Sequence, residues 1–165
     1  MEHTEPLSVE LGARLGEPVR IEWDPGALHE AAAASWRLSG ELDAERVAEL
    51  RVLSAVFEDG SLLGVASLRP SGATGHDADE LSAIIARPEG AAEQTSDVRL
   101  SVEYDGAGRP RRLGLELYAD PDAPPLRVAA DRSEEATEQS ASGAVPMSFR
   151  LDGTSGAGAY ELKRV

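Results

Sequence analysis

Residues 97–118 read Asp97-Val-Arg-Leu-Ser-Val-Glu-Tyr-Asp-Gly-Ala-Gly-Arg-Pro-Arg-Arg-Leu-Gly-Leu-Glu-Leu-Tyr118. Apolar and polar side chains alternate on both sides of a glycine-rich turn, from Val98 to Tyr104 and again from Leu113 to Leu117. A period of two is typical of a strand with one buried and one solvated face, as antiparallel sheets usually have. The segment therefore predicts an antiparallel β-hairpin whose apolar face points inward.

The charges on the solvated face predict the register of this hairpin. The expected opposed pairs are Tyr104–Arg111, Glu103–Arg112 and Arg99–Glu116. Opposite charges that face each other across two strands contribute about 0.2–1 kcal/mol per pair. A shift of the partner strand by two residues would lose both charged pairs, so we expect the first register.

Composition limits the class of protein. A chain of 165 residues suits one domain, and 41% hydrophobic with 4% aromatic residues predicts an aliphatic core. The net charge of −14 argues against nonspecific binding to nucleic acid or to an anionic membrane, both of which need a positive field. The absence of cysteine excludes disulfides, thiolate metal sites and a cysteine nucleophile.

The sequence also bears on location and source. No apolar run approaches the roughly 18 residues of a membrane span, and we expect no membrane insertion. The first residues are acidic, unlike those of a signal peptide, so a cytoplasmic location is expected. Lys163 is the only lysine among the 16 basic residues, and with the excess of alanine and glycine this indicates a bacterial gene rich in GC.

Further strands are predicted along the N-terminal half. Residues 1–17 form an arm or edge strand, alternation predicts strands over 19–23 and 36–42, and the alanine-rich residues 27–34 predict a short helix. A second hairpin joins residues 46–57 to 62–69 through the Asp59-Gly60 turn. Both of its strands are apolar on both faces, so we expect it to be covered on both sides.

The C-terminal half supplies the remaining elements. Residues 79–87 predict a strand, although their capping-box and apolar spacing also fits a helix. Residues 89–96 are a polar connection, 126–130 a short strand, and 131–143 a mobile acidic loop without apolar periodicity. A third hairpin joins 145–151 to 159–164 through a turn over 152–158.

These elements predict an all-β fold with at most one short helix. Eight to ten short strands in residues 18–165 fit a single antiparallel, lipocalin-like β-barrel or a strongly curved sheet. Closure into a barrel would remove exposed strand edges, so we prefer the barrel.

Part of the chain resembles a known family. The pieces that carry the resemblance are His76–Glu80, Leu81–Ala86, Tyr104–Arg111, Leu113–Leu117, Leu126–Ala129 and Phe149–Glu161. Their order is similar to that of the lipocalin-like second domain of the carotenoid 1,2-hydratase (hydroxyneurosporene synthase) superfamily, over residues 35–165. The resemblance implies a calycin-type barrel with an apolar interior. Members of that family have two such domains and many tryptophans, whereas this chain has room for one domain and holds two tryptophans, so no catalytic residue is carried over.

Candidate site residues are few. His76 lies among carboxylates and is the candidate general acid or base, although a solvated loop that enters the next strand is the favoured interpretation of these residues. Ligand-binding candidates in a barrel cavity are Trp36, Val56, Phe57, Tyr104 and Leu115, which otherwise fill the core. Arg37 and Arg99 either anchor a carboxylate or form surface ion pairs. We expect no metal site and no cofactor, because the acidic and glycine-rich turns lack the required spacing.

Three functions remain open at this point. The first is binding of a small hydrophobic ligand, such as a terpenoid or fatty compound, without catalysis. The second is an enzyme of the hydratase or isomerase type acting on such a compound. The third is a structural module that associates with a second copy of itself as a homodimer.

Overall fold

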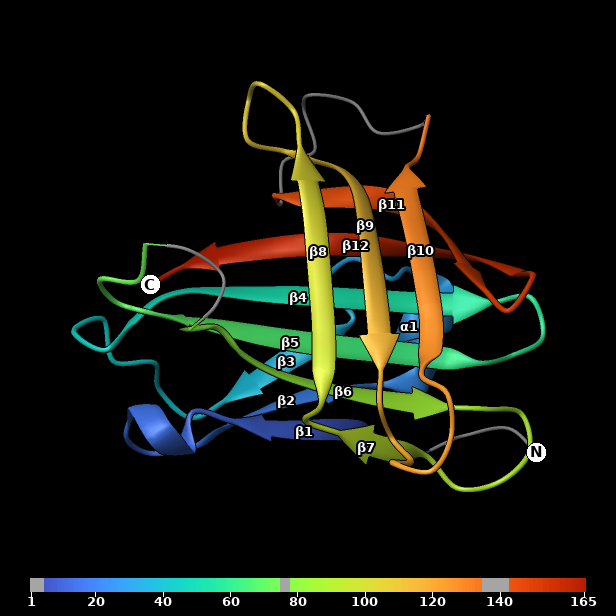
Figure 1. Cartoon of the computed structure of the whole chain (residues 1–165), viewed down its shortest axis with the longest axis horizontal. Coiled ribbons are helices and arrows are strands. Elements are labelled where there is room, and N and C mark those ends of the chain that lie inside the picture. Colours follow the sequence, from blue (N-terminus) through green and yellow to red (C-terminus); the bar gives the residue numbers. More distant parts are fainter. Residues whose placement is uncertain (1–4, 75–77, 135–142) are drawn as a thin grey trace.

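The computed structural model describes residues 5–74, 78–134 and 143–165. These residues form twelve strands, one α-helix and one 3-10 helix (Figure 1). In chain order the elements are β1 (Leu7–Leu11), η1 (Ala13–Leu15), β2 (Val19–Trp23), α1 (Pro25–Glu30), β3 (Trp36–Ser39), β4 (Val47–Phe57), β5 (Leu62–Pro70), β6 (Glu80–Ala86), β7 (Glu93–Thr95), β8 (Val98–Tyr104), β9 (Pro110–Leu117), β10 (Leu126–Arg132), β11 (Ala144–Leu151) and β12 (Thr154–Arg164). No helix in this part of the chain combines the length and apolar character needed to span a bilayer.

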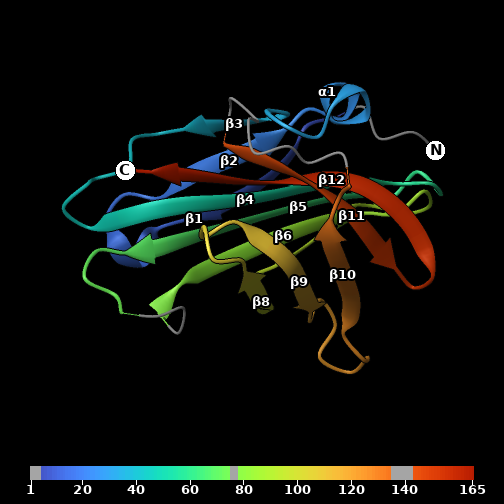
Figure 2. The same cartoon turned by 90° about the horizontal axis from the view of Figure 1, so that it is seen from above.

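Nine strands make one antiparallel sheet in the order β7-β6-β5-β4-β12-β11-β10-β9-β8. The sheet curls until β8 approaches β6, which makes a nearly closed barrel. In Figure 1 the strands β8, β9 and β10 cross β4 and β5 steeply, and Figure 2 shows them as a separate layer. The predicted all-β, antiparallel barrel is therefore confirmed.

The other three strands form a second sheet in the order β1-β2-β3. It lies on the outer side of the barrel, opposite the layer of β8–β10 (Figure 2). Contacts of β1 with β5 and β6 attach this sheet to the barrel wall. Residues 7–11, predicted as an arm or an edge strand, form the edge strand β1.

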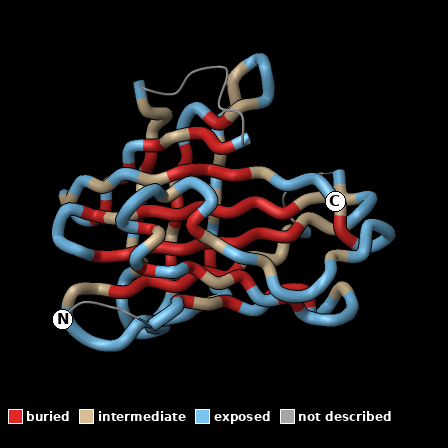
Figure 3. Tube along the Cα trace, turned by 180° about the vertical axis from the view of Figure 1, so that it is seen from behind, coloured by how far each residue is buried: buried red, intermediate tan, exposed pale blue. Residues whose placement is uncertain are grey.

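The hairpin β4–β5 is apolar on both faces because each face meets a different core. Leu53, Ala55 and Phe57 belong to the core inside the barrel. Leu50 and Val52 belong to the core between the barrel wall and the three-stranded sheet. Figure 3 shows the buried residues concentrated along these central strands. The prediction that this hairpin is covered on both sides is confirmed.

The hairpin of residues 97–118 has the predicted register over most of its length. Glu103 lies opposite Arg112 and Arg99 opposite Glu116, as the charge pattern indicates. The exception is a register shift after Glu103, which places Tyr104 opposite Pro110. The ion pairs themselves are different, because Glu103 pairs with the neighbouring Arg111 and Arg112 pairs with Asp131 of β10.

The short helix begins and ends earlier than predicted. Asp24 caps α1, because its carboxylate accepts the backbone N–H of Gly26 at 2.9 Å, and Pro25 fits the first helical position. Ala31 is already extended, so the alanine run does not continue the helix. The helix propensity of the alanines is therefore not enough to continue α1 beyond Glu30.

The turn predicted over residues 152–158 is wrong. The chain reverses at Asp152-Gly153, whose φ values of 48° and 82° match the type I′ turn favoured in hairpins. Residues 154–158 belong to β12. Gly156 and Gly158 leave room for aromatic rings, since an added Cβ would lie 2.6 Å from Phe57 and from Phe149 respectively.

Two connections also differ from their predictions. The polar connection of residues 89–96 contains the short strand β7, which pairs with β6. Within the predicted mobile loop 131–143, Asp131 and Arg132 extend β10. Residues 135–142 of that loop lie outside the described residues.

We expect Gly158→Ala to lower the free energy of unfolding by about 1–3 kcal/mol, as overpacking of a core does. The new methyl group would collide with the ring of Phe149 and with the backbone carbonyl of Ser54. Gly114→Ala on β9 is the matched control, because its Cβ would meet only Ser101 Oγ at 3.7 Å. The control should be neutral or stabilising by up to about 1 kcal/mol. Urea unfolding followed by circular dichroism measures both, and equal effects would contradict the packing argument.

Candidate functional site

A single arginine on β4 places a positive charge on the inner wall of the barrel. Arg51 lies in phase with Leu53, Ala55 and Phe57, whose side chains fill the barrel core. Its side chain is only 4% exposed. An arginine is costly to bury without partners, and buried charged groups with specific partners are candidates for a functional site.

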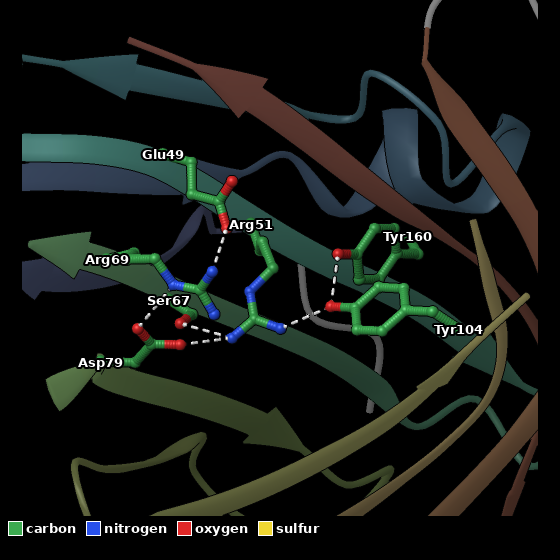
Figure 4. Close-up of polar contacts among 7 residues, drawn as sticks. All are labelled: Glu49, Arg51, Ser67, Arg69, Asp79, Tyr104 and Tyr160. Atoms are coloured by element: carbon green, nitrogen blue, oxygen red, sulfur yellow. Dashed lines mark hydrogen bonds and ion pairs between the residues drawn. The ribbon is translucent and has the colours of Figure 1, made fainter. Parts of the chain in front are cut away.

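Three elements supply hydrogen-bond partners to Arg51 (Figure 4). Its Nη2 donates to Asp79 Oδ2 at 2.6 Å and to Ser67 Oγ at 3.3 Å. Its Nη1 donates to the hydroxyl of Tyr104 at 3.1 Å. The guanidinium thus joins β4 to β5, to the residue just before β6, and to β8. It fastens together the two sides of the barrel that no strand ladder connects.

Asp79 is shared between two arginines. Its Oδ1 accepts the Arg69 Nε–H at 3.3 Å, while Oδ2 accepts from Arg51. Arg69 also pairs with Glu49 on β4, with 3.4 Å between Nη1 and Oε1. The Asp79 side chain is 1% exposed, whereas Arg69 and Glu49 are partly exposed. The ion pairs therefore run from the barrel interior toward its surface.

Two tyrosine hydroxyls complete the cluster on the side of Arg51 away from Asp79 (Figure 4). Tyr104 from β8 and Tyr160 from β12 have their hydroxyl oxygens 3.3 Å apart. Burial, together with the neighbouring Tyr104 hydroxyl, raises the pKa of Tyr160 well above its ordinary value. Tyr160 therefore stays protonated at neutral pH and serves as a hydrogen-bonding group. We name the seven residues drawn in Figure 4 the Arg51 cluster.

The inner wall around the Arg51 cluster is only partly covered. Leu81, Val102 and Leu162 pack against the barrel core but are half-buried. Farther along β4, Phe57 packs edge to face on Phe149 with ring centroids 6.4 Å apart, and both rings are buried. The polar cluster thus has half-buried apolar side chains around it.

This chain matches no family model, no curated protein and no solved structure.

The residues predicted to bind a ligand divide between the two cores. Phe57, Tyr104 and Leu115 face the barrel interior, and Tyr104 belongs to the Arg51 cluster. Trp36 and Val56 pack against the outer core, beneath the three-stranded sheet. The barrel wall separates the two groups.

The predicted polar candidates lie elsewhere. His76, the predicted acid or base, lies outside the described residues. Arg37 forms a surface ion pair with Glu22, and Arg99 lies over the ring of Tyr118 at 5.2 Å. Within the described chain no three side chains gather that could hold a metal ion.

Sequence reasoning missed Arg51 and the buried position of Asp79. The signal for Arg51 was present, because its charge stands in phase with Leu53, Ala55 and Phe57 on a strand apolar on both faces. Such a charge must find partners inside the fold. Its partners are far away in sequence, and alternation alone does not identify them.

Two cavities lie away from this cluster. One of about 660 Å³ lies between residues 12–19 and 41–47, against Leu68. Another of about 650 Å³ lies over Ser101, Gly114 and Ala129. Both lie outside the barrel, and neither is lined by Arg51.

A second buried charge lies on the outer face of β12. Glu161 is 8% exposed, and its Oε1 accepts the backbone N–H of Ala34 at 2.9 Å. Burial raises the pKa of the Glu161 carboxyl, and the hydrogen bond from Ala34 offsets this only in part. The carboxyl fastens the connection between α1 and β3 to the barrel.

We expect Glu161→Gln to reduce the loss of stability as pH rises. Because folding raises the pKa of Glu161, its contribution is complete below the ordinary value of 4.5 and is lost as pH rises through the folded value. Glutamine does not ionise, so the variant should gain stability relative to wild type as the pH is raised from about 4.5 to neutral. Urea midpoints across this range measure the effect, with Glu41→Gln as a control for general loss of charge. Parallel profiles of wild type and variant would contradict the argument.

Proposed function

We propose that this protein binds a small hydrophobic ligand in its barrel, with the polar end of the ligand at the Arg51 cluster. The observation that carries the proposal is the make-up of the inner wall, which over the described residues is largely apolar and has converging polar groups at the Arg51 cluster. Ligand sites are commonly apolar with a few polar groups that fix orientation, and small barrels can hold one small ligand.

The ligand class follows from the shape and chemistry of this wall. Leu81, Val102 and Leu162 offer an apolar surface beside the hydroxyls of Tyr104 and Tyr160. A terpenoid or fatty compound with one polar end would suit this arrangement. The resemblance to the second domain of the carotenoid 1,2-hydratase superfamily supports the same class, since it implies a calycin-type barrel with an apolar interior.

Val102→Trp tests this function by filling the inner wall beside Tyr104. Its neighbour Ser101 is exposed on the outer face of β8, so Ser101→Trp is the matched control. We expect farnesol, a terpenoid alcohol, to shift the methyl NMR resonances of barrel residues such as Leu53 and Val65. The resonances of outer-core residues such as Leu50 should stay in place. Val102→Trp should abolish the shifts and Ser101→Trp should preserve them.

Two results would reject ligand binding in the barrel. One is the absence of any methyl shift, both with farnesol and with any compound that native mass spectrometry identifies on protein purified from its own host. The other is equal binding by Val102→Trp and wild type.

One observation favours a second function, catalysis of the hydratase or isomerase type. The Tyr104 hydroxyl, hydrogen-bonded to Arg51 at 3.1 Å, could deliver a proton to a double bond held against the inner wall, and water adding to the resulting cation would release a proton in turn. Incubation of the terpenoid in D₂O would then place deuterium on carbon, and Tyr104→Phe would abolish this. If the ligand recovered after long incubation carries no deuterium, only binding without catalysis remains as the function.

Self-association and a cytoplasmic location stay predictions. Light scattering measures the first, and a strict monomer would oppose the homodimer.

A further inference from the structure

The charges of the Arg51 cluster balance within the described residues. Two arginines, Arg51 and Arg69, face two carboxylates, Asp79 and Glu49. The closest pair, Arg51–Asp79, is also the most deeply buried. Arg132 and Asp105, at the same side of the barrel, form a further balanced pair at 2.8 Å. Counted over the described residues, the Arg51 cluster therefore presents no net charge to a bound ligand.

The groups that face the apolar wall are also neutral. The Asp79 carboxylate and the Tyr104 hydroxyl take different terminal nitrogens of Arg51. The hydroxyls of Tyr104 and Tyr160 lie beyond the guanidinium, next to Val102 and Leu162. A hydroxyl can donate to and accept from an alcohol, and it can donate to a carbonyl oxygen.

An anionic head group would disturb this balance. A carboxylate at the tyrosine hydroxyls would add a third negative charge near Asp79 and Glu49, inside a wall of low polarity. Charge interactions in such surroundings are much stronger than in water, and a desolvated carboxylate needs a cation of its own. Arg51 already serves Asp79.

We infer that the ligand of the Arg51 cluster ends in an uncharged hydroxyl or carbonyl group rather than in a carboxylate. This inference rests on the proposed binding function and narrows it to neutral lipid-like alcohols, aldehydes and ketones. Fatty acids and other carboxylate lipids are disfavoured by the charge balance of the cluster.

The test compares 1-decanol with decanoate, which share a chain length and differ in the head group. Isothermal titration calorimetry of the whole chain at a pH at which the acid is ionised gives both dissociation constants. We expect decanol to bind at least about tenfold more tightly, because the carboxylate of decanoate would lie near Asp79 and Glu49 without a cation of its own.

Glu49→Gln changes the charge balance without touching the Arg51–Asp79 pair. It leaves the cluster with one excess positive charge, so decanoate should gain affinity and decanol should not. Glu116→Gln is the matched control, because Glu116 pairs with Arg127 on the outer face of the barrel at 3.6 Å. The control should leave both affinities unchanged.

Each outcome is decisive. The inference is supported if wild type binds decanol tightly and decanoate weakly, and if Glu49→Gln but not Glu116→Gln reduces the difference between the two affinities. Decanoate binding as tightly as decanol overturns the inference and leaves the proposed function standing. If Glu49→Gln has the same ratio of decanol to decanoate affinity as wild type, the charge-balance argument is overturned. If neither compound binds and the methyl resonances do not move, the proposed function falls and the inference falls with it.

Discussion

Asp79→Asn is expected to lower the free energy of unfolding by about 3–5 kcal/mol, the usual cost of removing one partner of a buried ion pair. Asparagine keeps the size of the side chain but removes its charge. Arg51, 4% exposed, would then keep its positive charge inside the barrel opposite a neutral amide. The loss should appear in urea unfolding followed by circular dichroism.

Asp131 offers a matched control with the same chemistry on the surface. It also accepts from two arginines, Arg112 at 2.9 Å and Arg150 at 3.0 Å. Its side chain is 38% exposed, so water and salt screen both pairs. Asp131→Asn should therefore cost less than about 1 kcal/mol.

A double variant separates charge from packing. Arg51→Met with Asp79→Leu removes both buried charges at similar volume, which is often neutral or stabilising. It should recover most of the stability lost in Asp79→Asn. If the Asp79 and Asp131 variants lose equal stability, the buried ion pair has no special role.

Trp23→Ala is expected to cost about 3–5 kcal/mol, as truncation of a fully buried aromatic side chain does. Trp23 is 0% exposed and lies flat on Gly64 of β5, where an added Cβ would come within 2.7 Å of the indole. Its Nε1 donates to Ser54 Oγ at 2.8 Å. Trp23 thus packs β2 of the three-stranded sheet on β4 and β5 of the barrel wall.

Trp23→Phe separates the contribution of the ring to stability from that of its hydrogen bond. Phenylalanine keeps an aromatic ring on Gly64 but leaves the buried Ser54 hydroxyl without this donor, at a cost of about 1–3 kcal/mol. Stability should therefore fall in the order wild type, Trp23→Phe, Trp23→Ala. A loss below about 1 kcal/mol for Trp23→Ala would show that the second sheet is only loosely joined to the barrel.

Periodicity predicted the strands well, because it reports burial directly. The alternation from Val98 to Tyr104 and from Leu113 to Leu117 identified the hairpin face that enters the barrel core. Residues 79–87, with both helical and strand patterns, form β6 because the strand completes the barrel wall. The doubly apolar β4 and β5 were expected to be covered, but the covering sheet itself was not foreseen.

Glycine misled the prediction at the third hairpin. Gly156 and Gly158 resemble turn residues, yet they lie in a long strand beside Phe57 and Phe149. A glycine that makes room for a neighbouring ring and one that permits a turn look alike in the sequence. Only the partner ring distinguishes them, and it comes from another strand.

The candidate site was the least predictable part of the molecule. Tyr104 was foreseen on the inner wall, whereas Arg51, Asp79 and Tyr160 were not assigned to a site. Arg51, Tyr160 and Asp79 come from neighbouring parts of the sheet, and barrel closure brings Tyr104 of β8 to them. Such proximity depends on long-range pairing, which local patterns do not encode.

The place of β12 between β4 and β11 has a consequence for synthesis on the ribosome. Residues of β12 meet partners made much earlier, as the contact between Ala34 and Glu161, 127 positions apart, illustrates. While β5 to β11 are being made, the edge of β4 that later pairs with β12 has no partner strand, and exposed apolar edges favour aggregation. We therefore expect the folding chain to be most prone to aggregation before β12 has been made and has paired with β4.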